Sequence, residues 1–220
     1  MLAGAMSALR KLAEHLDLPI ATTVSGQGSL PETHPNALGV VGSNGGVPAT
    51  RAEVDAADVV IFVGCRAGSV TTERWSSPKA GTTIIHIDSD PMVIGANYQT
   101  DVAICADARS TLEAILRETR AHGDWPGQNG AQRAAKAWKA KLAEFAPLAA
   151  STERPIRPEA VMAAMIEVLP PDAVICADPG TPWPDVSAHY RLPSAGWHFI
   201  SNRAHGALGY SLAAAVGAQV

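Results

Sequence analysis

The spacing of apolar residues along the chain predicts alternating helices and strands. Residues 2–16 repeat apolar side chains every three or four positions, which is the period of an amphipathic helix. Short segments that are apolar at nearly every position predict buried strands over residues 19–23, 58–64, 82–88 and 102–106. Further helices are predicted over residues 48–56, 110–120 and 132–146, with a Gly-rich loop before the first of them and a helical turn from Pro91.

Helices that alternate with continuously apolar strands indicate a parallel sheet covered on both faces. The predicted fold class is therefore α/β, with a Rossmann-like central domain. Ligands of such sheets bind beyond the carboxyl ends of the strands. Those ends carry Thr22-Thr23, Gly64-Cys65-Arg66, Asp88-Ser89-Asp90 and Asp107.

A second, incomplete α/β domain is predicted after a Pro-rich boundary at residues 151–158. It comprises a helix from Pro158, a strand over 173–177, a short strand over 197–200 and a final helix. The predicted organisation is a central domain at 1–122, a connecting helix and linker at 123–157, and the opening of a second domain at 158–220. The final helix lacks a polar face, so we expect it to pack against missing neighbours and the chain to be a fragment.

Charge and hydropathy exclude several classes of partner. The 17 Lys and Arg residues against 21 Asp and Glu residues give a net charge of −4, with no basic stripe for nucleic acid. No apolar run is long enough to span a membrane and no signal-peptide pattern is present, so a cytoplasmic protein without a membrane partner is predicted. Cys65, Cys105 and Cys176 lack metal or redox spacing and are expected to be buried structural thiols.

Two segments of the second unit have residues suited to binding a ligand. Gly206 and Gly209 bracket a strand-to-helix turn, which suits either close backbone approach to a flat ligand or close helix packing. On the residues alone, packing is favoured. Asp178-Pro179-Gly180-Thr181 follows a strand and suits either a diphosphate or an ordinary turn. Arg203 and His205 precede the glycine turn, where they would face either a ligand cleft or solvent.

The central unit offers fewer candidates. Asp88 suits either the ribose of a dinucleotide or a helix cap, whereas Asp90 before Pro91 favours a cap. His86 lies inside an apolar strand, where a hydrogen-bonded core histidine is favoured over a ligand.

Six segments in order resemble thiamine-diphosphate-dependent enzymes of the acetolactate synthase type. They are PIATTVSGQGSLPETHPNALGVVG, ADVVIFVGCRAGSVTT, TTIIHIDSDPMVIGAN, VAICADA, VICADPGT and HGALGYSLAAAVGAQ. The resemblance covers the central domain over about residues 2–119 and the opening of the diphosphate-binding domain. It implies decarboxylation or carboligation of a 2-oxo acid in an oligomer, and so a lyase or transferase.

The resemblance also implies roles for individual residues. Gly180 and Thr181 would hold the diphosphate, and the turn at Gly206 and Ala207 would hold the aminopyrimidine through the Gly206 carbonyl. Leu208 would wedge under the cofactor and bend it into its reactive shape. His205 lies in Arg203-Ala204-His205, which replaces the family's Gly-Gly-Leu and would alter substrate choice.

Other family features are absent or altered. The glutamate that protonates the cofactor and the magnesium ligands would lie outside this chain, so no catalytic or metal residue is assigned and the chain alone is expected to be inactive. Arg66-Ala67-Gly68-Ser69 replaces the Arg-Phe-Asp-Asp of flavin-binding members, which argues against FAD. Arg66 and Asp88 remain candidates for an adenine dinucleotide. The alternatives are therefore a dinucleotide-binding module and a non-catalytic remnant.

Overall fold

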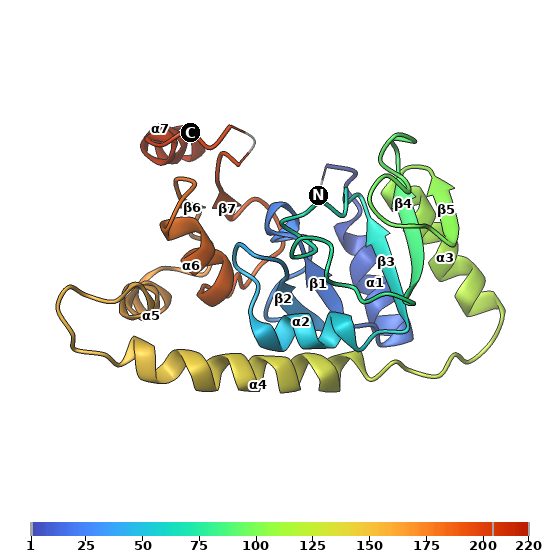
Figure 1. The fold of residues 1–220 in the computed structure, drawn as a ribbon, viewed down its shortest axis with the longest axis horizontal. Coiled ribbons are helices and arrows are strands. Elements are labelled where there is room, and N and C mark those ends of the chain that lie inside the picture. Colours follow the sequence, from blue (N-terminus) through green and yellow to red (C-terminus); the bar gives the residue numbers. More distant parts are fainter. Residues whose placement is uncertain (1, 204, 220) are drawn as a thin grey trace.

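The protein has an α/β fold built from short parallel sheets and the helices around them (Figure 1). The structure, a computed structural model, describes residues 2–203 and 205–219. The α/β fold class predicted from the alternating pattern is confirmed, although the strands do not form one continuous sheet. The central unit holds a two-stranded sheet, β1-β2, and a three-stranded sheet in the order β3-β4-β5.

Strands β3 (Val59–Val63), β4 (Thr83–Asp88) and β5 (Val102–Cys105) lie parallel, with β4 in the middle. Helix α1 (Met6–Leu16) packs against α3 (Ala108–Ala121), and the side chain of Val63 joins the apolar cluster between these helices. Asp107 caps α3 by accepting a hydrogen bond from the amide of Ser110 at 3.0 Å. The predicted cover on both faces is wrong for the outer strands, where Val59, Ile61 and Val102 are exposed.

Strand β2 (Ala37–Val40) was missed, because its sequence was assigned to the Gly-rich loop. It is buried throughout and pairs in parallel with β1 (Ile20–Thr22), and a short 3₁₀ turn (Val24–Gly26) follows β1. Gly39 adopts φ 91°, and a Cβ on it would lie 3.3 Å from the ring of Trp138. Glycine is therefore required inside this strand. It interrupts the run of apolar residues by which a buried strand is normally predicted from sequence.

Helix α4 (Gly130–Ala149) runs along one side of the molecule and contacts both units (Figure 1). It packs against β2 and against helix α2 (Pro48–Asp55), and the indole Nε1 of Trp138 donates to the carbonyl of Ala37 at 2.7 Å. Its far end meets α5 (Pro158–Val168). The connecting helix predicted at 132–146 is thus longer at both ends and packs on both units. The proposed boundaries at residues 122 and 157 stay predictions.

The second unit adds β6 (Ile175–Cys176), α6 (Pro182–His189), β7 (Phe199–Ile200) and α7 (Tyr210–Ala218). Its core contains Met162, Ile175, Val186, Leu192 and Phe199. Helix α6 was missed, because its sequence was taken for a loop. Pro182 and Pro184 lie in its first turn, where proline has no intrahelical bond to break.

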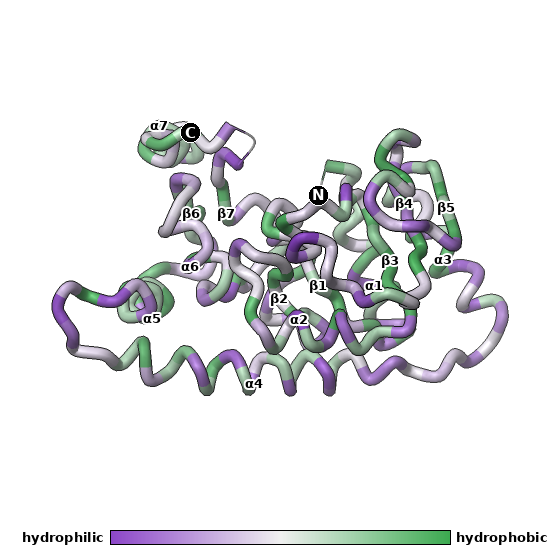
Figure 2. Tube along the Cα trace, viewed as in Figure 1, coloured by the Kyte–Doolittle hydropathy of each residue, from purple (hydrophilic) through white to green (hydrophobic). Residues whose placement is uncertain are grey.

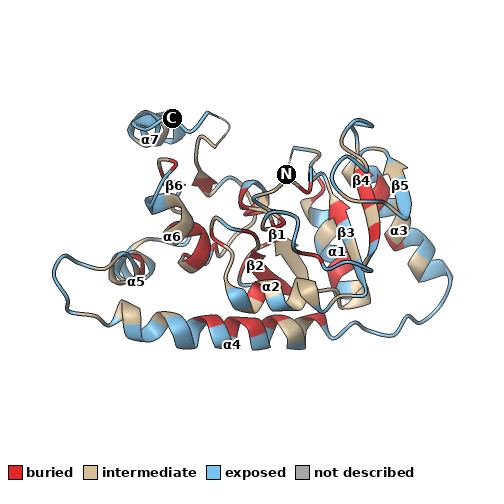
Figure 3. Cartoon of the chain, viewed as in Figure 1, coloured by how far each residue is buried: buried red, intermediate tan, exposed pale blue. Residues whose placement is uncertain are grey.

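Helix α7 is apolar but exposed along its described length (Figures 2 and 3). None of its described residues is buried, so the expectation that this helix packs against further neighbours stays a prediction. Among the described residues, no helix has the length and apolar character that crossing a membrane requires.

The thiols differ from expectation, whereas His86 agrees with it. Cys105 is exposed, and Cys65 and Cys176 are only half-buried, so the expected burial of the three thiols is not found. His86 is buried, and its Nε2 donates to the carbonyl of Cys65 at 2.9 Å. It is therefore a hydrogen-bonded core histidine.

Candidate functional site

The carboxyl ends of β6 and β7 meet at one edge of the second unit. The two strands are parallel, with Ile175 opposite Phe199 and Cys176 opposite Ile200. The segment Asp178–Thr181 leaves the end of β6, and the segment that leads to Gly206 leaves the end of β7. The topology therefore brings together the two segments that the sequence analysis singled out for the cofactor.

Asp178 joins these two segments directly. One carboxylate oxygen accepts from the amide of Gly209 at 2.6 Å, and the other accepts from the amide of Ser211 at 2.7 Å. These amides belong to the start of α7, where backbone N–H groups have no intrahelical partner. They hold the pKa of Asp178 below its usual range, because they stabilise the ionised carboxylate. Asp178 thus fixes the glycine turn to the end of β6.

The glycines at this edge have left-handed backbone angles and open surroundings. Gly180 has φ 129°, Gly206 has φ 64°, and a Cβ on either would meet no atom within 4 Å. The backbone angle therefore requires glycine here, and the open side leaves the peptide groups accessible. Thr181 is exposed and precedes α6, and Ala207 and His205 are exposed beside Gly206. Ala204 lies outside the described residues.

Leu208 is 78% exposed, although it is a large apolar side chain. It lies between Gly206 and the start of α7, on the segment that Asp178 holds. Leu212, one turn into α7, has the same exposed fraction. The site thus presents apolar surface next to accessible peptide groups, which suits a ligand with an apolar ring and polar edges.

Arg203 connects this edge to the central unit. Its guanidinium lies 4.3 Å from the ring centroid of Trp183 on α6, and it donates to the hydroxyl of Ser25 at 3.4 Å. Burial lowers the pKa of Arg203 to about 9. The Gly-rich loop that follows β1 therefore lies against the segment that follows β7.

Arg66 and Asp88 lie elsewhere, at the carboxyl end of the β3-β4-β5 sheet. Arg66 is exposed after β3, and its carbonyl accepts from the side-chain amide of Asn97 at 2.8 Å. Asp88 ends β4 and accepts from the amide of Asp90 at 3.0 Å. Strands β4 and β5 lie at one end of the molecule, and β6 and β7 lie toward the other (Figure 1). These two residues therefore form a separate candidate site.

Asp90 has the capping role that the sequence analysis favoured for it. Its side chain accepts from the amide of Met92 at 2.9 Å, so it caps the turn that begins at Pro91.

A buried charged cluster that the sequence analysis missed lies at the junction of the two units. Glu32 is 2% exposed, and its carboxylate accepts from the amide of Leu192 at 2.9 Å and from Gln27 Nε2 at 3.2 Å. Lys141 on α4 is 4% exposed, with its ammonium 4.1 Å from the ring centroid of Trp138. Burial raises the pKa of Glu32 and lowers that of Lys141 to about 8. This cluster holds the units together.

One comparison identifies the family to which the chain belongs. Residues 1–115 match the family described as "Thiamine pyrophosphate enzyme, central domain", which is more than half of the chain. The chain therefore belongs to the thiamine pyrophosphate enzyme family, as the resemblance of its six segments implied.

Relatives that are similar to the chain include acetolactate synthases. The chain is 32% identical over its full length to a probable acetolactate synthase large subunit of Methanocaldococcus jannaschii, of which it covers 37%. It is 28% identical over 99% of its length to acetolactate synthase isozyme 3 large subunit of Escherichia coli, of which it covers 38%. A pyruvate oxidase of Lactiplantibacillus plantarum is 29% identical over 88% of the chain. The chain spans 31% of the length of this oxidase and little more than a third of the length of the two synthases.

The residues at the edge of β6 and β7 fit thiamine diphosphate, which is the same compound as thiamine pyrophosphate. Accessible peptide groups at Gly180 and Gly206 suit the polar ends of the cofactor, and the exposed Leu208 suits the faces of its aromatic rings. Asp178 is the residue of this candidate site to which sequence reasoning assigned no role. Its position directly before a glycine turn was the available signal, but its partners lie 31 and 33 residues away.

Proposed function

We propose that this chain forms part of a thiamine-diphosphate-dependent enzyme that cleaves or forms a carbon–carbon bond next to the carbonyl of a 2-oxo acid. One observation carries the proposal: Asp178 ties the segment after β6 to the glycine turn before α7. The family membership of the central unit and the similarity to acetolactate synthases support it. The reaction class would be that of a lyase or a transferase.

Each residue at this edge has a distinct role in the proposal. Peptide groups and the hydroxyl at Gly180 and Thr181 would bind the diphosphate, since the turn leaves them accessible. The carbonyl of Gly206, beside Ala207, would accept from the amino group of the pyrimidine ring. Leu208 would hold the two rings in a bent arrangement, and His205 would face the substrate. When bound, thiamine diphosphate supplies the carbon nucleophile and the electron sink for this chemistry.

The remaining requirements would be met outside these 220 residues. Among the described residues, no group of three His, Cys, Asp or Glu side chains is placed to hold a metal. We propose that residues outside this chain would hold Mg²⁺, which would neutralise the charge of the diphosphate, and that this chain by itself is inactive. A homo-oligomer in the cytoplasm, acting on a small 2-oxo acid, completes the proposal.

A second binding function is favoured by the placement of Arg66 and Asp88. Both follow neighbouring parallel strands, at the edge where α/β sheets bind dinucleotides. We propose an adenine dinucleotide as the ligand class, with FAD disfavoured because Arg66 is followed by Ala-Gly-Ser. Flavin absorbance of the purified protein would test whether FAD is bound. Stoichiometric FAD would contradict our inference that FAD is not the ligand.

The principal test uses the full-length protein with thiamine diphosphate, Mg²⁺ and pyruvate as the probe substrate. We expect carbon dioxide release, and we expect Leu208→Ala to lower kcat about a hundredfold, since misplaced reacting groups have effects of this size. Leu212→Ala is the matched control, because the same side chain is equally exposed one turn later. An unchanged kcat in Leu208→Ala would refute the role of Leu208. Dinucleotide binding without thiamine diphosphate binding would favour the binding-module alternative, and binding of neither would favour a non-catalytic remnant.

A further inference from the structure

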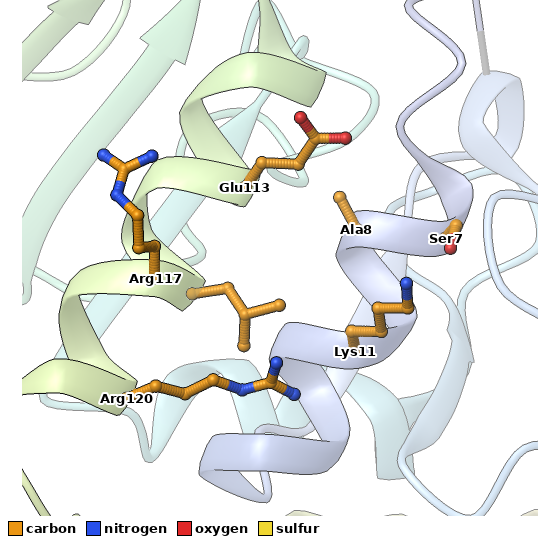
Figure 4. A pocket seen from close by; sticks show the side chains of 7 residues that line it. Ser7, Ala8, Lys11, Glu113, Arg117 and Arg120 are labelled. Atoms are coloured by element: carbon orange, nitrogen blue, oxygen red, sulfur yellow. The ribbon is translucent and has the colours of Figure 1, made fainter.

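A groove of about 410 Å³ lies between α1 and α3 (Figure 4). Its floor is apolar, because the buried side chains of Ala8 and Leu116 lie at the bottom, where the two helices pack. The volume falls in the range of small-molecule sites, which is about 300–1,000 Å³. It is lined only by residues of α1 and α3, so it is separate from the edge of β6 and β7.

The rim of this α1–α3 groove is cationic. Lys11 projects from α1, and Arg117 and Arg120 project from α3 (Figure 4). Arg117 and Arg120 lie one and two helical turns beyond Glu113. In Figure 4 the Arg120 side chain extends towards Lys11 across the groove, whereas the Arg117 guanidinium points away from the space between the helices.

Little negative charge within the protein balances this rim. Glu113 is the one carboxylate that lines the groove, and it already accepts from the Nε of Arg109 at 3.0 Å. Arg117 has the exposed Glu118 at 3.2 Å on its own helix. Lys11 and Arg120 make no ion pair with any residue in the described parts of the chain. Two cations on facing helices repel each other unless an anion lies between them.

We propose that the α1–α3 groove binds a small organic polyphosphate. Its phosphate groups would bind Lys11 and Arg120 at the rim, and its remaining part would lie on Ala8 and Leu116. Guanidinium groups bind phosphate oxygens in pairs, and a lysine adds a point charge, so the rim suits adjacent phosphates better than a single carboxylate. The hydroxyl of Ser7 at the edge offers a further polar contact. This site does not depend on the proposed enzymatic function.

Calorimetric titration with inorganic pyrophosphate and with ADP, at low ionic strength, tests the proposal. We expect the α1–α3 groove to contribute one binding site for each probe, the site that the variants below remove, and we expect ADP to bind there more tightly because its nucleoside covers the apolar floor. Affinity should fall as salt is added, since exposed charges are screened. The double variant Lys11→Gln/Arg120→Gln should weaken binding at least about tenfold, because each lost charge-assisted hydrogen bond has an appreciable effect.

The matched control is Lys136→Gln/Lys139→Gln, which removes the same charge from exposed positions on α4. We expect it to bind both probes as the unmodified protein does. The variants all change exposed side chains, so circular dichroism should show the same fold in each. Equal weakening in both double variants would overturn the proposal, because only net charge would then matter. Absence of binding at millimolar probe, or binding of succinate as tight as that of pyrophosphate, would also overturn it.

Discussion

Replacing Glu32 by alanine should destabilise the protein strongly, although Glu32 lies far from the proposed cofactor edge in sequence. The substitution leaves the buried amide of Leu192 and the side-chain amide of Gln27 without their acceptor. It also removes the negative charge near the buried Lys141. Each of the two buried donors that lose their acceptor costs about 1–3 kcal/mol, and the loss of the negative charge near Lys141 adds to this cost. We therefore expect a loss of about 3–5 kcal/mol in the free energy of unfolding at pH 7.

Urea unfolding measures this loss, with tryptophan fluorescence, to which Trp138 at the junction contributes, and far-UV circular dichroism as two probes. Glu32→Gln is the milder variant, because its amide oxygen still accepts one hydrogen bond, and it should lose about 1–2 kcal/mol. Glu144→Ala is the control, since Glu144 is exposed on α4, and it should stay within about 0.5 kcal/mol of the unmodified protein. A loss below about 1 kcal/mol for Glu32→Ala would refute the argument that this carboxylate holds the units together.

Three further predictions concern pH, the cap of α7 and the glycine turn. Burial lowers the pKa of Lys141 from 10.5 to about 8, so the folded chain loses this proton first as pH rises. Urea unfolding of the unmodified protein and of Lys141→Met should be compared between pH 8 and 10.5. Over this range the free energy of unfolding of the unmodified protein should rise by up to about 3 kcal/mol relative to that of the variant. A difference that stays constant with pH would contradict this prediction. Asp178→Asn should speed amide hydrogen exchange at Gly209 and Ser211, whereas Asp172→Asn at an exposed position should not. Folding lowers the pKa of Asp178, so the stabilisation that its carboxylate provides is present above the pKa of the unfolded chain. This stabilisation is lost as pH falls through the lower pKa of the folded chain. Gly206→Ala should lower the free energy of unfolding by about 1–2 kcal/mol through its positive φ alone, and Gly68→Ala, which is equally open but not at positive φ, should have little effect in the same urea assay.

The periodic parts of the fold were predictable from sequence, because local apolar spacing determines them. The helices at 6–16 and 108–121 and strands β3 to β5 all lie within a few residues of their predicted positions. Strand β2 and helix α6 were not predicted. A glycine required by Trp138 interrupts the first, and prolines that are harmless at a first turn obscure the second.

The candidate site was predictable only in part. Its glycines stand out locally, since a turn of this kind leaves a mark in the sequence. The role of Asp178 depends on amides more than 30 residues away, and the burial of Glu32 depends on Leu192. Polar residues of these types are ordinarily exposed, so their composition and spacing gave no sign of these long-range partners.

The contact between Glu32 and Leu192 has a consequence for how the protein is made. Its two residues are separated by 160 positions, so the ribosome completes the central unit well before it synthesises the partner. At about 5–20 residues per second, this interval lasts roughly 8–32 s. During it, Glu32 remains in water with its ordinary affinity for protons. The nascent chain therefore carries a solvated carboxylate at the surface where its second half later docks, and docking of that half is the step that removes it from water.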